Sequence, residues 1–75
     1  MAKKGPSTIQ DRLHRIEGQV RGVEKLVDNG AEVEKITVQI QAVISSLESV
    51  KLELVKRQMR DQLMAQVDSV TSLLK

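Results

Sequence analysis

The stretch from residue 31 to residue 64, AEVEKITVQIQAVISSLESVKLELVKRQMRDQLM, contains neither Gly nor Pro and is the clearest indication of the fold. Apolar residues recur along it at alternating spacings of four and three, which is the pattern of a helix with one apolar stripe. This stripe consists of Ile36, Ile40, Val43, Leu47, Val50 and Leu54. Residues 33–44 are rich in β-branched side chains, but a strand does not continue a helical stripe over several further turns. The pattern therefore predicts a helix over residues 32–64.

A second stripe lies upstream, between Pro6 and Gly30. It consists of Ile9, Leu13, Ile16, Val20, Val23 and Val27. Ser7, followed three residues later by Gln10, fits a capping box, which satisfies amide groups of the first turn. Gly30 suits the left-handed position just after a helix end. The sequence thus predicts a first helix over residues 7–29, preceded by a flexible basic tail at residues 1–6.

Residues 65–69 leave the end of the long helix open to two interpretations. Asp68 or Ser69 would cap a short third helix over residues 67–75, whereas the apolar spacing is equally compatible with one continuous helix. Both interpretations give a single all-α domain, residues 1–75, in which two long helices form an antiparallel hairpin.

The composition predicts that this hairpin associates with further copies. The chain has 75 residues, no Cys and no aromatic residue, so its own core is thin and no disulfide can stabilise it. The longer helix extends past the shorter one, and the apolar residues of this overhang need cover. They are Leu52, Val55, Met59 and Leu63. We expect two hairpins to form a four-helix-bundle dimer, which could pair further into a tetramer.

Charge and composition exclude several classes of function. Twelve Lys and Arg against ten Asp and Glu give a net charge of +2, which is too small to indicate nucleic acid by itself. No apolar run has the length of a membrane span or the pattern of a signal peptide, so a cytoplasmic location is expected. With a single His, His14, and no Cys, the chain lacks a catalytic nucleophile–base set, and we do not expect an enzyme.

Residues 12–22, RLHRIEGQVRG, form the most distinctive motif of the chain. Together with VQIQAV at 38–43 and LESV at 47–50, the motif resembles the signature of the CsoR/RcnR family of bacterial repressors, which respond to metals, formaldehyde or sulfur species. The resemblance covers residues 9–63. It implies an all-α dimer of hairpins, often paired into a tetramer, that binds double-stranded operator DNA without a helix-turn-helix.

Two glycines within this motif, Gly18 and Gly22, disfavour the helix that contains them, by roughly 1 kcal/mol each relative to Ala. Their spacing fits two interpretations equally well: close approach of another helix, or close approach of a phosphate backbone.

The chain departs from the family where the resemblance places metal or thiol ligands. The first ligand position is Val33, and the second and third are Gln58 and Gln62. Valine has no donor atom, amides are poor ligands for soft copper and nickel ions, and thiol chemistry needs a Cys. We therefore interpret the sensor site as degenerate and expect no metal cofactor. The two glutamines would otherwise be ordinary polar residues at a solvated helix edge, form a polar layer that fixes dimer register, or belong to a site for another small ligand.

The resemblance also assigns residues to operator contact. These are Arg12, Arg15, Gln19 and Arg21, and basic residues of the second helix, Lys56, Arg57 and Arg60, would support them. The first three lie within about 60° on one helix face, at about 100° per residue. Arg21 lies on another side, and surface salt bridges are the alternative role for all of these charges.

The leading hypothesis is a DNA-binding transcriptional repressor whose sensor site is degenerate. Three alternatives stay open: a helical protein–protein interaction module, a partner of a ligand-responsive paralogue, and a repressor that senses a non-metal ligand.

Overall fold

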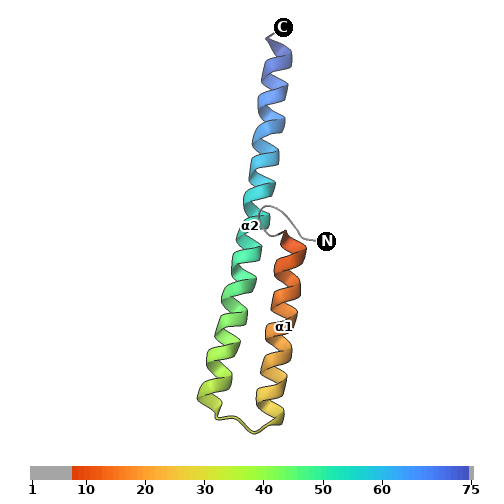
Figure 1. The fold of residues 1–75 in the computed structure, drawn as a ribbon. Coiled ribbons are helices and arrows are strands. Elements are labelled where there is room, and N and C mark those ends of the chain that lie inside the picture. The colour runs from red at the N-terminus through yellow and green to blue at the C-terminus, as the bar shows by residue number, and fades with distance from the viewer. Residues whose placement is uncertain (1–7, 75) are drawn as a thin grey trace, which may run out of the picture.

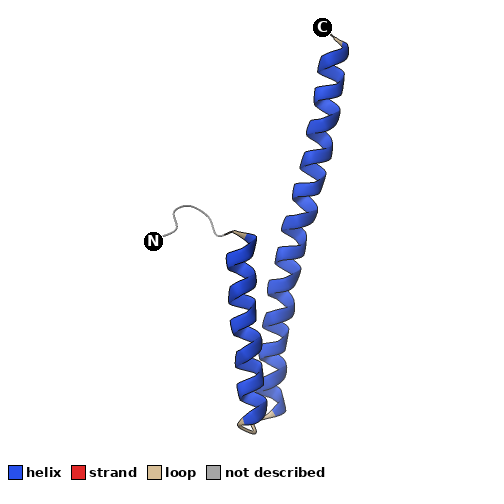
Figure 2. Ribbon diagram, turned by 90° about the vertical axis from the view of Figure 1, so that its right-hand side faces the viewer, coloured by secondary structure: helices blue, strands red, loops and turns tan. Residues whose placement is uncertain are grey.

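A computed structural model of the chain describes residues 8–74 and contains two helices, α1 (Ile9–Asp28) and α2 (Val33–Leu73), with no strand among them. The helices lie side by side in an antiparallel hairpin, and α2 continues far beyond the start of α1 (Figure 1). A view turned by 90° shows the same long unaccompanied half of α2 (Figure 2). The predicted all-α hairpin is confirmed.

The N-terminal cap of α1 differs from the predicted one. Thr8 is the capping residue: its hydroxyl accepts a hydrogen bond from the Asp11 amide at 3.0 Å, and the Asp11 carboxylate accepts one from the Thr8 amide at 3.3 Å. The predicted pair of Ser7 and Gln10 was wrong, and Ser7 itself lies outside the described residues. Ser and Thr are both preferred N-cap residues, so the sequence motif alone does not distinguish Ser7 from Thr8. The reciprocal hydrogen bonds with Asp11 identify Thr8 as the cap.

The turn between the helices forms at Gly30, as predicted. Gly30 has a φ of 69°, and the amides of Gly30 and Ala31 donate to the carbonyls of Val27 and Leu26 at 3.1 and 2.9 Å. These bonds satisfy carbonyl groups that the end of α1 leaves without helical partners. The turn reverses the chain within four residues, 29–32, and so fixes the antiparallel arrangement.

The C-terminal part of α2 has no break at residues 65–69, where the sequence was also compatible with the start of a short third helix. Helix continues through Asp68 and Ser69 to Leu73. No Gly or Pro interrupts this segment, so the helical hydrogen bonds simply continue. Neither helix described here carries an apolar stretch long enough to cross a membrane.

The hairpin core is thin and uses only alternate members of each apolar stripe. Ile16, Val43 and Val50 are buried, and Ile9 and Val23 pack against them. The intervening members of the stripes are exposed, and we call them the apolar face: Leu13, Val20, Val27, Ile40, Leu47 and Leu54. Between the helices, polar side chains such as Gln39 and Ser46 are half-buried. One chain therefore covers only part of its apolar residues.

The environments of the glycines predict opposite effects for two alanine substitutions. Gly30→Ala should destabilise the protein by about 1 kcal/mol, because an alanine is strained at positive φ. Gly18→Ala should stabilise it by up to about 1 kcal/mol, because no atom lies within 4 Å of the added Cβ. Urea unfolding followed by circular dichroism at one protein concentration measures both. A destabilised Gly18→Ala variant would indicate that a second chain packs on this residue.

The same observation narrows the role of the two glycines in the motif. An added Cβ at Gly18 or at Gly22 meets no atom within 4 Å. Close approach of α1 to α2 within one chain was therefore the wrong explanation. Approach of another molecule, either a second chain or a phosphate backbone, stays a hypothesis.

Candidate nucleic-acid interface

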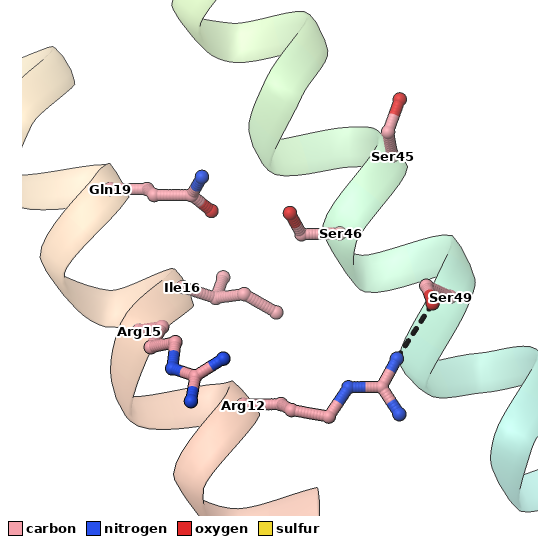
Figure 3. Close-up of a pocket in the computed structure, with 7 residues that line it drawn as sticks. All are labelled: Arg12, Arg15, Ile16, Gln19, Ser45, Ser46 and Ser49. Atoms are coloured by element: carbon pink, nitrogen blue, oxygen red, sulfur yellow. Dashed lines mark hydrogen bonds between the residues drawn. The ribbon is translucent and has the colours of Figure 1, made fainter. Parts of the chain in front are cut away.

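One side of the hairpin carries a groove lined by polar and basic side chains, which we call the arginine groove. Its lining residues are Arg12, Arg15, Ile16, Gln19, Ser45, Ser46 and Ser49 (Figure 3). The α1 members are three or four residues apart and so share one face of the helix. Buried Ile16 lies between the helices, and the groove encloses about 390 Å³.

Arg12 connects the two helices across this groove. Its Nη2 atom donates a hydrogen bond of 2.6 Å to the Ser49 hydroxyl, and Figure 3 shows the side chain extending from α1 to α2. A hydroxyl partner leaves the arginine charge uncompensated, unlike a carboxylate. The contact therefore orders the guanidinium while leaving its positive charge available to an anion.

Gln19 occupies the other end of the groove. Its Oε1 atom is buried and has no hydrogen-bond partner in the structure. Figure 3 shows the amide directed toward α2, and the Ser46 hydroxyl lies on the side of α2 that faces it. Buried carbonyl oxygens in proteins are normally paired, so this atom requires an explanation.

The basic residues of α2 extend the charged surface beyond the groove. Arg57 lies beside the start of α1, where it lines a second hollow together with Thr8, Asp11 and His14. Its Nε atom is 3.5 Å from Glu53 Oε2, one helical turn away. Lys56 and Arg60 are exposed neighbours of Arg57 on α2. The surface thus continues from the groove onto the first turn of the overhang.

Arg21 lies apart from this surface. It lines a different hollow with Leu13 and Val20, which belong to the apolar face. Six residues separate Arg21 from Arg15, which turns it about 120° around α1 at about 100° per residue. The structure therefore brings together Arg12, Arg15 and Gln19, places Arg57 close by, and separates Arg21.

The three positions at which the resemblance places ligands cannot meet within one chain. Val33 is the first residue of α2 and is 74% exposed. Gln58 follows 25 residues later, about 37 Å along the helix at about 1.5 Å per residue. Gln62 lies one turn beyond Gln58. A site that combined these positions would need a second chain.

The residues at these positions do not fit a metal. One side chain has no donor and the other two offer neutral amides, which soft ions bind poorly. No cluster of three or more His, Cys, Asp or Glu residues capable of holding a metal occurs within residues 8–74.

We predict that the protein does not bind Cu(I) or Ni(II) with micromolar or tighter affinity. Equilibrium dialysis against a chelator of known affinity measures this directly. A Gln58→His, Gln62→Cys, Val33→Cys triple variant is the positive control, because it restores the donors that the resemblance implies. One equivalent of metal held tightly by the unmodified chain would contradict our interpretation of the three positions.

Sequence reasoning missed the three serines of the groove. Ser45, Ser46 and Ser49 resemble ordinary small residues of a helix, and nothing in their spacing reveals a partner. The contact between Ser49 and Arg12 depends on the register of the hairpin, which Gly30 and the helix ends determine. Once the turn is placed, residues 12 and 49 lie at nearly equal distances from it.

The structure places a basic and polar groove on one side of a two-helix hairpin. The chain belongs to the family of metal-sensitive transcriptional repressors, whose model matches residues 7–75. Members of this family are regulators and not enzymes, as the sequence predicted.

Two curated relatives share part of their length with the chain. The copper-sensing transcriptional repressor CsoR of Bacillus subtilis (strain 168) is 42% identical over 55 residues, which cover 73% of this chain and 54% of the relative. The copper-sensing transcriptional repressor RicR of Mycobacterium tuberculosis is 44% identical over 43 residues, which cover 57% of this chain and 45% of the relative. The chain thus spans about half the length of these relatives. No solved structure matches it significantly.

Proposed function

We propose that the protein is a DNA-binding transcriptional repressor that acts as a homo-oligomer and lacks a functional metal sensor. Double-stranded operator DNA would contact Arg12, Arg15 and Gln19 in the groove. The basic residues of α2, Lys56, Arg57 and Arg60, would contact the flanking phosphates. Arg21, on another side of α1, would reach DNA only from a neighbouring chain.

The observation that carries this proposal is the separation of two surfaces on one hairpin. Arg15 and Leu13 are two residues apart and so point about 160° away from each other around α1. Ser49 and Leu47 have the same relation on α2. Both helices therefore turn their apolar face to one side and the groove to the other. Copies that associate through the apolar face would leave the groove open to DNA.

Symmetry gives this arrangement enough charge to act on DNA. A single chain has a net charge of +2, but a dimer or tetramer repeats the ordered guanidinium of Arg12 and its neighbours at fixed intervals. Arginine binds phosphate oxygens through its planar array of N–H donors, and glutamine can hydrogen-bond base edges. Repeated contacts of this kind produce binding that weakens steeply with salt.

Selection from a pool of random duplexes by gel shift, in moderate salt, tests the proposal. We expect a defined sequence to be enriched. The logarithm of its binding constant should fall linearly with the logarithm of salt concentration, with a slope of about −0.9 per phosphate contacted. If no duplex is retained at any salt concentration, the repressor proposal fails.

The exposed apolar face is also compatible with an alternative function, that of a helical protein–protein interaction module. Such a module would need the face formed by residues such as Leu47 and Ile40 but not the ordered contact between Arg12 and Ser49. It would form oligomers, or bind a paralogue, without any affinity for DNA. The same gel-shift experiment separates the two functions.

A further inference from the structure

The buried carbonyl oxygen of Gln19 points to a ligand in the arginine groove. This atom has no hydrogen-bond partner in the structure, and native proteins leave few buried acceptors in that condition. It lies beside an open cavity of about 390 Å³. A molecule in the cavity that donates an N–H or O–H to Gln19 would satisfy it.

The other end of the same groove is lined by two positively charged side chains. Arg12 and Arg15 both line it, and the guanidinium of Arg12 is held in place by Ser49. A guanidinium has five N–H donors, and the contact with Ser49 uses one of those of Arg12. Further donors come from the serine hydroxyls, which can each donate one hydrogen bond while accepting others.

Together these groups define the chemistry of the occupant. We propose that the groove binds a small oxyanion that carries its own hydrogen-bond donor, of which hydrogen phosphate is the simplest. Its negative oxygens would lie against Arg12 and Arg15, and its O–H would donate to Gln19. The phosphodiester of DNA has such oxygens but no donor, so it satisfies the arginines and leaves Gln19 unpaired.

The proposal has a regulatory consequence, which rests on the proposed DNA-binding function. Arg12 and Arg15 would be shared by the oxyanion and by operator DNA. The two ligands would then compete, and the oxyanion would release the protein from DNA. Such a site would allow the chain to respond to a small molecule although its metal positions hold Val33 and two glutamines.

Phosphate and sulfate at about pH 8 provide a matched pair of probes, because both are then tetrahedral anions with a charge close to −2, but only phosphate retains an O–H. Isothermal titration of the unmodified protein with sodium phosphate and with sodium sulfate, at equal ionic strength, measures binding without DNA. We expect phosphate to bind about tenfold or more tightly than sulfate, the effect of one hydrogen bond to a charged group. Equal affinities would show a general anion patch with an adventitious ion only, and would overturn the proposal, as would no binding of either anion.

Variants locate the site and separate its parts. Gln19→Leu should lose the preference for phosphate over sulfate, because the acceptor is gone while the side-chain size is kept. Ser49→Ala should weaken the binding of both anions because Arg12 loses its support, and Ser49→Thr should restore it. Lys35→Ala removes a charge about 21 Å from Ser49 along α2, at about 1.5 Å per residue, and should bind both anions as the unmodified chain does. Unchanged binding in both Gln19→Leu and Ser49→Ala would place the anion elsewhere and contradict the proposal.

A gel shift with the selected duplex, in phosphate or in sulfate buffer of equal ionic strength, tests the competition. We expect DNA to be released at lower concentrations of phosphate than of sulfate. DNA retention that is identical in the two buffers would overturn the competition. If the protein binds no DNA in either buffer, the repressor proposal fails, and the titration of the protein alone still decides whether the oxyanion site exists.

Discussion

Leu47→Lys is expected to dissociate the assembled protein while leaving the isolated hairpin almost unaffected. Leu47 is 45% exposed in the single chain, so a lysine at this position reaches water and costs one hairpin little. Packed against a second copy, the same side chain would bury an unpaired ammonium, which costs about 3–5 kcal/mol. Sedimentation equilibrium at micromolar concentration, together with circular dichroism, measures the loss of mass and any loss of helix.

Val38→Lys is the matched control for this substitution. Val38 lies nine residues before Leu47, about 180° around the helix at about 100° per residue, and is also exposed. It should sediment as the unmodified protein does. If Leu47→Lys retained the mass of the assembly, or if the unmodified chain were a folded monomer, the apolar face would not be the interface.

Arg15→Ala should reduce affinity for the selected duplex while helicity and oligomer size stay unchanged. If Arg15 contacts a base edge, each copy should lose about 1–3 kcal/mol and the preference at one position of the site should relax. If it contacts a phosphate, all sequences should weaken alike and the salt slope should become shallower by roughly one unit per copy. Gel shifts with the selected and with a scrambled duplex, at several salt concentrations, separate these outcomes.

Two controls accompany this variant. Lys35→Ala removes the same charge far from the groove and should bind the duplex as the unmodified protein does. Asp11→Asn removes a negative charge near the DNA-facing side and should hold or slightly tighten binding. Alanine is unsuitable at this position because Asp11 closes the capping box with Thr8, and losing a cap costs about 1 kcal/mol. Binding by Arg15→Ala that equals the unmodified protein for every duplex would favour the interaction module.

The fold could be predicted because two local signals agree. The apolar stripes require helices, and Gly30 is the residue best able to adopt the backbone of the turn between them. The stripes could not show which of their members face the partner helix of the same chain. That division, with Ile16 buried and Leu13 exposed, depends on how many neighbours the hairpin has.

The candidate site was predictable only where it lies on one helix. Arg12, Arg15 and Gln19 share a face because their spacing is helical, and this needs no tertiary information. The role of Ser49 and the unpaired carbonyl of Gln19 depend on contacts between residues far apart in the sequence. Arg21 belongs to the same motif, yet its angle on the helix places it on another surface.

The stability of the C-terminal segment of α2, which extends past α1, depends on the concentration of the protein. Beyond Arg57 the helix has no neighbour among the described residues, 8–74 (Figure 1), and most of the stability of a protein helix comes from tertiary packing. In a dilute solution of single hairpins, amide hydrogens of residues 58–73 should exchange with solvent quickly, and proteases should cleave there first. A rising concentration of chains protects the same segment by mass action. Newly made copies that find no partner would thus be the first to be degraded, and the population that survives would consist of assembled molecules.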